Sequence, residues 1–341
     1  MTEFHYWLST NCVTWRGTDH AARALEAFGH PEAERVRRES DAFRADLLRG
    51  FETNRRHAPL VPLSDGRWVP HYPSRLYCRG RDRGWIRELL EGAVYLLISG
   101  LYDPDSKQAS WILADLQENL YHSPPYGYVM RDPGTTLRHR GGFSIQPNLL
   151  AGLMPHLDRD EIEVYLWMFF NAWVSCYREE VSGMIEHPMP ELGFDNATAF
   201  KTSDESNAVM WLRYMMVYST PRFLHLGRAI PRAWFAHGEE VRITGVRTHY
   251  GEVSARWVSE LAQGRIRLEA VLDGPQDAPS VLARFRHPRK EPLASVTVNG
   301  AAWPRIDPVK GDVDITGLRG KLEIVAQWDT RPIRRGSASS P

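Results

Sequence analysis

The spacing of apolar residues changes once along this chain, and that change limits the folds open to it. Up to about residue 235 the apolar residues recur at helical spacing, and from Glu240 onward they alternate with polar residues. The 341 residues are enough for two separate cores. The sequence therefore predicts a multidomain fold, first α and then β. The predicted parts are a helical-hairpin domain at residues 1–236, a small antiparallel β-sandwich at 237–330 and a disordered tail at 331–341.

The helical part begins with a predicted antiparallel hairpin. Its first helix spans residues 4–28 and stops at Gly29-His30-Pro31, where a glycine ends one helix and a proline starts the next. The second helix spans residues 31–51 and carries its apolar residues on one stripe. Further helices are expected at residues 85–101, 106–121, 146–156, 159–180, 203–219 and 231–236.

The connections between these helices alternate in length. Short ones join the two helices of a hairpin, and three long ones, at residues 52–84, 122–145 and 181–202, join successive hairpins. Long ordered loops in compact domains are usually functional. If the hairpins stand side by side, the three long loops emerge at the same end. We therefore expect the functional site at that end.

The second part reads as short strands separated by turn signals such as Gln263-Gly264 and Asn299-Gly300. Several short strands at close spacing are typical of an antiparallel sandwich. The predicted strands are VRITGV, GEVSARWVSEL, GRIRLEAVL, SVLARFRHP, ASVTVNG, DVDITGL and KLEIVAQW.

The charge balance and the apolar runs exclude some partners. Lysine and arginine total 42, as do aspartate and glutamate, whereas nucleic-acid binding rests on an excess of clustered cations. The best apolar run, Ala93 to Gly100, is too short to span a bilayer. The first residues lack the basic and apolar regions of a signal peptide. We expect a cytoplasmic protein that binds neither nucleic acid nor membrane.

Motifs for metals and cofactors are missing from the sequence. Cys12, Cys78 and Cys176 lie far apart, without a CxxC pair or a zinc-type spacing. The sequence contains no GxGxxG, GxxxxGK[ST], HExxH or GxSxG motif. We therefore predict no metal site and no cofactor.

The densest group of polar residues lies between two apolar helices. Hydrolysis of a glycosidic bond needs two carboxyl groups, one protonated and one ionised. Glu186, Asp204 and Glu205 are the predicted catalytic residues, with His187 and Lys201 placed to hold one carboxylate ionised. A structural alternative applies to Glu205, because the run TSDE at residues 202–205 matches a helix capping box.

Two further polar groups are candidates for substrate binding. In the first, Gln146 and Asn148 supply amide groups that suit sugar hydroxyls, next to Arg138 and His139; entry into a helix is the equally good structural reading. In the second, Trp68, His71 and Tyr72 form a predicted substrate wall, and the structural alternative is an ordered loop packed on its own aromatic residues.

A set of runs in the second half of the chain forms a recognisable pattern. They are EHPMPELG at 186–193, FKT at 200–202 with DE at 204–205, LGRAIPRAW at 226–234, THYGEVS at 248–254, RFRHP at 284–288 and SVTVNG at 295–300. This pattern resembles the C-terminal half of bacterial six-hairpin glycosidase-like proteins, a mostly uncharacterised group with a trailing β-sandwich. The resemblance implies an (α/α)6-type toroid with catalytic carboxylates on loops at one mouth, at Glu186 and the Asp204-Glu205 pair.

The number of long helices departs from that pattern. Six or seven are predicted here, which is half of a twelve-helix toroid. The chain is then a fragment that lacks an N-terminal half, or its open edge pairs with a second chain, or the enzyme is degenerate.

Three functions remain open from the sequence. The leading one is a glycoside hydrolase-like domain with a carbohydrate substrate, in which Glu186 is the general acid and Asp204 or Glu205 the base. The second is a polysaccharide lyase acting on a uronate-containing glycan, using His71, Tyr72, Arg138, His139 and Asn148. The third is a non-catalytic module for glycan binding or assembly.

Overall fold

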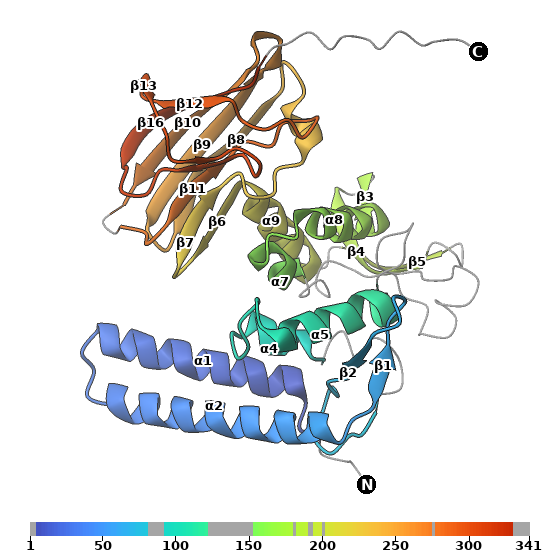
Figure 1. The fold of residues 1–341 in the computed structure, drawn as a ribbon. Helices are drawn as coiled ribbons and strands as arrows, with labels where there is room; N and C mark the ends of the chain where they lie inside the picture. Colours follow the sequence, from blue (N-terminus) through green and yellow to red (C-terminus); the bar gives the residue numbers. More distant parts are fainter. Residues whose placement is uncertain are drawn as a thin grey trace, which may run out of the picture. The chain divides into compact units, whose positions relative to one another are not determined.

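The computed structural model describes residues 5–80, 92–121, 153–179, 182–189, 194–199, 202–274 and 277–329. The chain divides into two compact units, Met1–Ala208 and Val209–Pro341. Helices dominate the first unit and two β-sheets dominate the second (Figure 1). The predicted order, helices first and mostly antiparallel sheets afterwards, is confirmed at this level.

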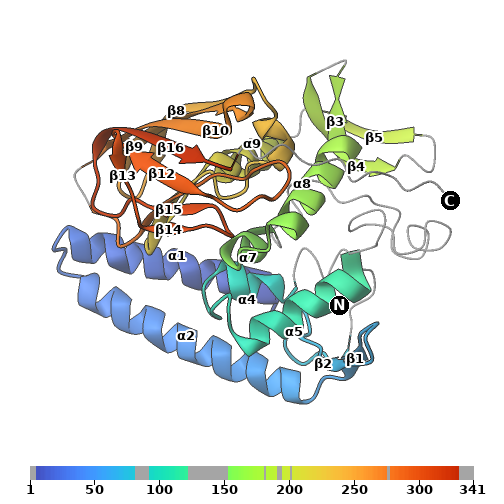
Figure 2. The ribbon, with the colours of Figure 1, turned by 45° about the horizontal axis from the view of Figure 1, so that its top comes forward.

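The first unit opens with the predicted hairpin of α1 (Leu8–Ala27) and α2 (Ala33–Arg56), which lie side by side in both ribbon views (Figures 1 and 2). Gly29 between them has φ 63°, the left-handed conformation that favours glycine. Arg37 of α2 ties the hairpin together by bonding to two carboxylates of α1. Its Nη1 lies 2.5 Å from Asp19 Oδ1 and its Nε 2.8 Å from Glu26 Oε1.

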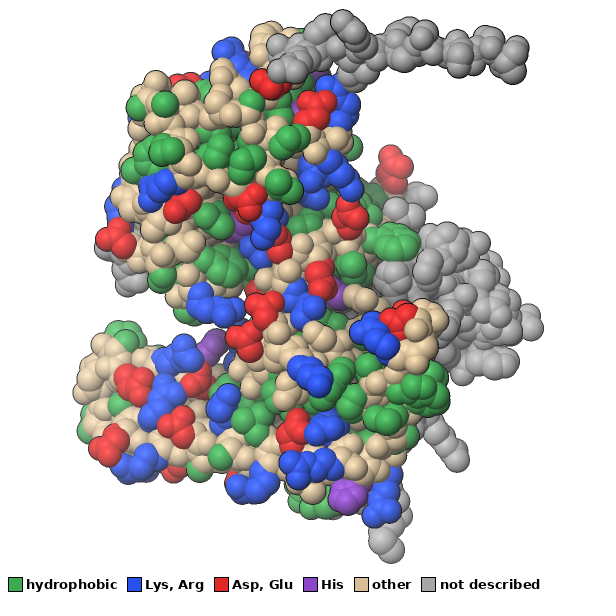
Figure 3. All heavy atoms as spheres, in the orientation of Figure 1, with side chains coloured by type: hydrophobic (Ala, Val, Ile, Leu, Met, Phe, Trp, Pro, Cys, Tyr) green, Lys and Arg blue, Asp and Glu red, His purple; other side chains and the backbone are tan. Residues whose placement is uncertain are grey.

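Basic and acidic side chains are interspersed over the face of this hairpin (Figure 3). This mixture is expected for a solvated helical surface with several i,i+3 and i,i+4 ion pairs. None of the described helices combines the length and the apolar character needed to cross a bilayer.

A hairpin of two short strands, β1 (Leu60–Pro62) and β2 (Trp68–Pro70), follows α2, within the long connection that the sequence predicted. Next come α4 (Val94–Ile98) and α5 (Lys107–Asp115). Ser106 caps α5, since its Oγ accepts a hydrogen bond from the Ala109 N–H at 3.1 Å. The same helix continues as a π-helical turn, η1 (Leu116–Tyr121).

The last part of the first unit combines helices with a small sheet. It comprises α7 (Leu153–Asp158), α8 (Ile162–Cys176), β3 (Tyr177–Arg178), β4 (Gly183–Met189), β5 (Phe194–Ala199) and the start of α9 (Thr202–Met216). The sequence pattern indicated a loop where β4 and β5 lie. Pro188 explains the difference, because proline cannot donate to a β-ladder, and here it sits at an irregularity in the pairing of β4 with β5.

The second unit contains a six-stranded antiparallel sheet, ordered β13-β12-β16-β10-β9-β8, and a five-stranded sheet, ordered β14-β15-β11-β7-β6. The first sheet is built from β8 (Glu240–Thr248), β9 (Gly251–Glu260), β10 (Arg265–Asp273), β12 (Ser295–Val298), β13 (Ala301–Ala302) and β16 (Gly320–Gln327). The second is built from β6 (Val217–Thr220), β7 (Phe223–Leu226), β11 (Val281–Arg284), β14 (Ile306–Asp307) and β15 (Asp312–Asp314).

Each of the seven predicted strand segments contains a strand. Two differences concern the five-stranded sheet. Its strands β6 and β7 lie where the sequence indicated the end of a helix and a connection. Moreover, β7 pairs with β11 in parallel, whereas an all-antiparallel arrangement was predicted. The long stretch of chain between these two strands, which carries β8 to β10 of the other sheet, supplies the crossover that a parallel pair requires.

The two sheets share one hydrophobic core. Leu226 and Ala283 of the five-stranded sheet belong to the same buried cluster as Leu268 and Ile324 of the six-stranded sheet, around the fully buried Trp257. Along β10, buried residues alternate with more exposed ones. One face of the six-stranded sheet is thus committed to the core, and the other carries the polar residues.

All three cysteines are free thiols. Cys12 and Cys176 are buried, and Cys78 is half-buried. Burial raises the pKa of the Cys12 thiol to about 12.

A pair of glycine substitutions tests the packing of the second unit. Gly300 and Gly311 both have positive φ, 78° and 77°. A Cβ at Gly300 would meet open space, whereas one at Gly311 would lie 2.2 Å from the Phe285 carbonyl oxygen. We expect Gly300→Ala to lower the free energy of unfolding by about 1 kcal/mol and Gly311→Ala by about 3 kcal/mol, measured by urea denaturation. Equal losses would contradict the close approach at Gly311.

Candidate functional site

The predicted catalytic residues lie on the β4–β5 hairpin and at the start of α9. In β4, the backbone of Glu186 stands opposite Thr198 of β5, and the pairing becomes irregular between Glu186 and Pro188. Such bulges often occur next to active sites, where they redirect a side chain. Lys201 and the side chains of Glu186 and His187 lie outside the described residues.

Asp204 and Glu205 occupy the first turn of α9, where the positive end of the helix dipole favours acidic residues. The Asp204 side chain is fully buried, and Glu205 is half-buried. Glu205 Oε1 accepts a hydrogen bond from the backbone N–H of Met184 at 3.4 Å. This bond joins the start of α9 to β4 two residues before Glu186.

Apolar side chains lie next to this junction. Met184 packs with Cys176 and Ala208, and Trp173 and Tyr177 cover the same cluster. The rings of Trp173 and Tyr177 are stacked, with centroids 5.3 Å apart. The junction therefore combines a hydrogen-bonded carboxylate with an aromatic stack.

The three residues of the predicted substrate wall differ in their exposure to solvent. The Trp68 side chain is 63% exposed, whereas His71 and Tyr72 are only 1% and 3% exposed. His71 Nδ1 lies 3.1 Å from Asp115 Oδ2 at the end of α5. Of the three residues, Trp68 alone is on the surface.

The buried Tyr72 lies beside the half-buried Glu52 carboxylate. Its hydroxyl donates to Glu52 Oε1 at 3.3 Å, the Tyr102 hydroxyl donates to the same oxygen, and Arg55 Nε donates to Oε2 at 2.8 Å. Burial and the neighbouring Glu52 charge raise the pKa of Tyr72. The pKa of Glu52 is lowered, because the hydrogen bonds from Tyr102 and Arg55 outweigh its burial.

These shifts keep Tyr72 protonated at neutral pH, where it acts as a donor. A β-elimination base must instead give up its proton and reach the substrate. The geometry therefore offers no support for a lyase that uses Tyr72.

The π-helical turn after α5 holds a group of polar contacts that the sequence analysis missed. Just before the turn, Asp115 bonds to His71; within the turn, Gln117 and Glu118 each bond to another segment. Gln117 Nε2 lies 3.1 Å from His156 Nε2, and Glu118 Oε1 accepts from Ser64 Oγ at 2.9 Å. π-turns occur frequently at functional sites. The sequence signal for this group is Asp115, an acid that directly follows the apolar run WILA of α5.

The remaining predicted contacts, Arg138, His139, Gln146 and Asn148, lie outside the described residues. Among the described residues, no group of three or more His, Cys, Asp or Glu side chains is arranged to hold a metal ion.

The second unit contains a separate buried polar cluster on β7, β11 and β15. Arg284 binds Asp312 in a bidentate fashion, with Nε 2.6 Å from Oδ1 and Nη2 2.7 Å from Oδ2. Arg228 Nη1 lies 2.8 Å from His225 Nδ1. Because arginine is only a donor, this His225 nitrogen accepts, and its Nε2–H donates to Asp312 Oδ1 at 3.3 Å.

The charges in this cluster follow from that geometry. Burial lowers the pKa of His225 to about 4, despite the nearby Asp312, so the imidazole is neutral at pH 7. The pKa of Asp312 is lowered because hydrogen bonds from Arg284 and His225 outweigh its burial. With every partner buried, the cluster joins three strands and the Arg228 segment rather than forming an accessible site.

Comparison with known proteins gives structural neighbours only, since no protein-family model and no curated protein matches the chain. A GH127 β-L-arabinofuranosidase from Geobacillus stearothermophilus T6 is similar at TM-score 0.30 and 11% identity, over 53% of this chain and 31% of that chain. A structure described as a glycoside hydrolase is similar at TM-score 0.29 and 11% identity, with the same coverage. Another GH127 β-arabinofuranosidase matches at TM-score 0.27 and 9% identity, over 93% of this chain and 59% of that chain. The chain thus spans about a third of the first two neighbours.

The buried His71–Asp115 contact can be tested by substitution. Asp115→Asn removes the charge but keeps the shape, and we expect it to lower the free energy of unfolding by about 1–3 kcal/mol, because a buried hydrogen bond to a charged group is weakened. Asp105→Asn at an exposed position is the control, with an expected change within about 0.5 kcal/mol. Urea denaturation followed by tryptophan fluorescence measures both. An Asp115 variant as stable as the control would contradict a structural role for the contact.

The neutral state of His225 predicts a dependence of stability on pH. Its pKa is 6.5 when unfolded and about 4 when folded, so the unfolded chain binds the extra proton between these values. Stability should therefore fall by about 3 kcal/mol as the pH drops from 6.5 to 4. The lowered pKa of Asp312 adds a further loss only below its unfolded value of 3.8.

The matched variant for this effect is His225→Gln, which cannot titrate. Urea denaturation at several pH values between 7.5 and 4 should show a smaller loss for the variant than for the wild type. Parallel curves would mean that His225 is not the titrating group.

Proposed function

We propose that this chain is a glycoside hydrolase-like domain that binds and cleaves an oligo- or polysaccharide through carboxylates of the β4–β5 and α9 junction. The observation that carries the proposal is the hydrogen bond from the Met184 N–H to Glu205 Oε1. It brings an acidic side chain of α9 next to the strand that bears Glu186.

Strand geometry limits the distance between the two acids. Along an extended strand, the backbone nitrogen of Glu186 is about 7 Å from that of Met184. Since Glu205 Oε1 is 3.4 Å from the Met184 nitrogen, the Glu205 carboxylate lies within about 10 Å of the Glu186 backbone. Glycosidases separate their two carboxyl groups by about 5 Å when retaining and by roughly 6.5–9.5 Å when inverting. Both separations are within the reach of a glutamate side chain at position 186.

The burial of the acids suggests a division of roles. In this proposal Glu186 is the general acid, and Glu205 is the base or nucleophile because it is partly accessible. Asp204 is fully buried, so it acts as a positioning residue at the start of α9. His187 and Lys201 adjust the charge of the pair, and the exposed Trp68 stacks on a sugar ring. Arg138, His139, Gln146 and Asn148 contact substrate hydroxyls.

The same proposal includes the arrangement of the chain as part of a helical toroid followed by a β-sandwich. The helices of the first unit form part of an (α/α)6-type toroid, and the two sheets of the second unit, β6 and β7 included, form a β-sandwich. A second chain or a further N-terminal half completes the toroid.

The test is turnover of a panel of 4-nitrophenyl glycosides and polysaccharides by the full chain. Glu186→Gln and Glu205→Gln should each lower kcat/KM by about 10²–10⁴-fold, because each removes a proton-transfer or nucleophilic group. Glu179→Gln, at an exposed position before β4, is the matched control and should keep full activity.

Two results would reject the hydrolase. One is full activity of the Glu205→Gln variant. The other is glycan binding by the wild-type chain without any turnover, which would leave the non-catalytic binding module.

A further inference from the structure

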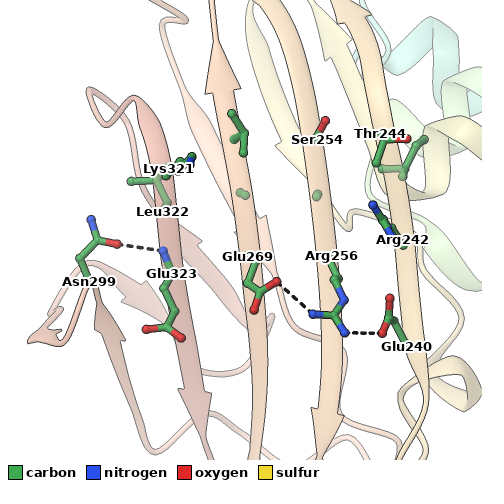
Figure 4. A pocket seen from close by; sticks show the side chains of 14 residues that line it. Glu240, Arg242, Thr244, Ser254, Arg256, Glu269, Asn299, Lys321, Leu322 and Glu323 are labelled. Carbon is green, nitrogen blue, oxygen red and sulfur yellow. Dashed lines mark hydrogen bonds and ion pairs between the residues drawn. The ribbon is translucent and has the colours of Figure 1, made fainter.

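The outer face of the six-stranded sheet carries a groove of about 870 Å³ that the proposed catalytic residues do not use. It crosses β8, β9, β10 and β16, and its lining side chains project from these strands (Figure 4). Ligand pockets in proteins usually fall between about 300 and 1,000 Å³. The size of the groove therefore suits a small ligand or a short piece of a polymer.

A row of four charged residues crosses the groove from strand to strand. The strand register places Arg242 opposite Arg256, Arg256 opposite Glu269, and Glu269 opposite Glu323. Like charges directly opposite one another destabilise a sheet. The row contains two such pairs. Opposite charges offset both of them, since Arg256 pairs with Glu240 and Glu269, and Arg267 pairs with Glu269 and lies 3.8 Å from Glu323.

Arg256 is the fixed centre of this row. Its Nη2 lies 2.6 Å from Glu240 Oε2 and its Nη1 3.1 Å from Glu269 Oε2 (Figure 4). The two carboxylates neutralise its charge and hold its guanidinium across the floor of the groove. Glu240 Oε1 can accept a hydrogen bond from a ligand, whereas Glu269 Oε1 already accepts one from Arg267 Nη1.

Two other cations line the groove and, unlike Arg256, are not held by carboxylates. In the part of the chain that the structure describes, Arg242 on β8 and Lys321 on β16 form no ion pair. They stand on the first and last of the four strands, three strand spacings across and two residues along, so their backbones are about 16 Å apart. The groove thus offers a positive charge near each end and hydrogen-bonding side chains between them.

The chemistry of the lining selects among ligands. Nucleic-acid binding rests on a run of clustered cations, whereas the lining of this groove has two cations outside ion pairs, one near each end. An extended peptide would pair with the edge of a sheet rather than lie on its face. A sugar chain instead offers hydroxyls that both donate and accept, matching the carboxylates and the hydroxyl and amide groups of Ser254 and Asn299.

We propose that this groove binds a short acidic oligosaccharide, with Arg242 and Lys321 each pairing with a carboxylate of a uronate unit. The choice of a glycan rests on the proposed function, and the groove adds a binding site separate from the residues assigned to catalysis.

The test uses the full chain with Glu205→Gln, so that no probe is hydrolysed. Tri-galacturonate is titrated by calorimetry, and the amide signals of Ser254 and Val271 are followed by NMR. We expect tri-galacturonate to bind and to shift both signals, and added salt to weaken the binding. Arg242→Ala and Lys321→Ala should each weaken binding at least tenfold.

Three controls define the interpretation. Lys310→Ala removes an exposed cation between β14 and β15 of the other sheet, and it should leave binding unchanged. An unchanged urea midpoint in the Arg242 and Lys321 variants shows that their sheet is intact. Maltotriose, a neutral probe, should bind at least tenfold more weakly than tri-galacturonate.

The proposal is overturned if tri-galacturonate leaves the Ser254 and Val271 signals unchanged, if both groove variants bind as the parent does, or if maltotriose binds equally well. Failure of the hydrolase proposal has a different signature, because a wild-type chain without turnover still gives these NMR shifts.

Discussion

Residues of both sheets of the second unit pack in one cluster with the indole of Trp257, which is fully buried. The main chain passes so near to it that a Cβ on Gly227 would lie 3.1 Å from the indole ring and 2.8 Å from the Arg284 carbonyl oxygen. The contact fixes the register of β9, since a shift by one residue would turn Trp257 and its apolar neighbours outward. Through the same alternation, Arg256 and its row of charges must face solvent. The hydrophobic core and the charged groove are therefore two results of a single register.

Local signals in the sequence were sufficient for part of this fold. The hairpin of α1 and α2 follows from Gly29, which adopts the expected positive φ, and the seven strand segments follow from strict alternation. The segments that were missed depend on more distant or more subtle causes. β6 and β7 have four residues each, too few to show a period, and β4 contains a proline at an irregular pairing position.

The candidate site shows the same limit more clearly. Residue types alone grouped Trp68, His71 and Tyr72 together, yet their surroundings differ because of carboxylates far away in the chain. His71 meets Asp115 across 44 positions, and Tyr72 meets Glu52 across 20. A sequence read locally does not contain such contacts. The hydrogen bond between Glu205 and Met184 of β4 is a contact of the same kind, and it places one of the predicted acidic residues beside the strand that bears Glu186.

The different burial of the three thiols has a practical consequence. Thiol-reactive dyes attack the thiolate, so Cys12, whose buried sulfur holds its proton, and Cys176, which is also buried, should resist them. Cys78 is half-buried, and its thiol donates a hydrogen bond to the nearby Gly80 carbonyl oxygen at 3.1 Å. The natural chain therefore provides a single preferred attachment point for a fluorophore, close to the β1–β2 hairpin in sequence and without any engineered cysteine.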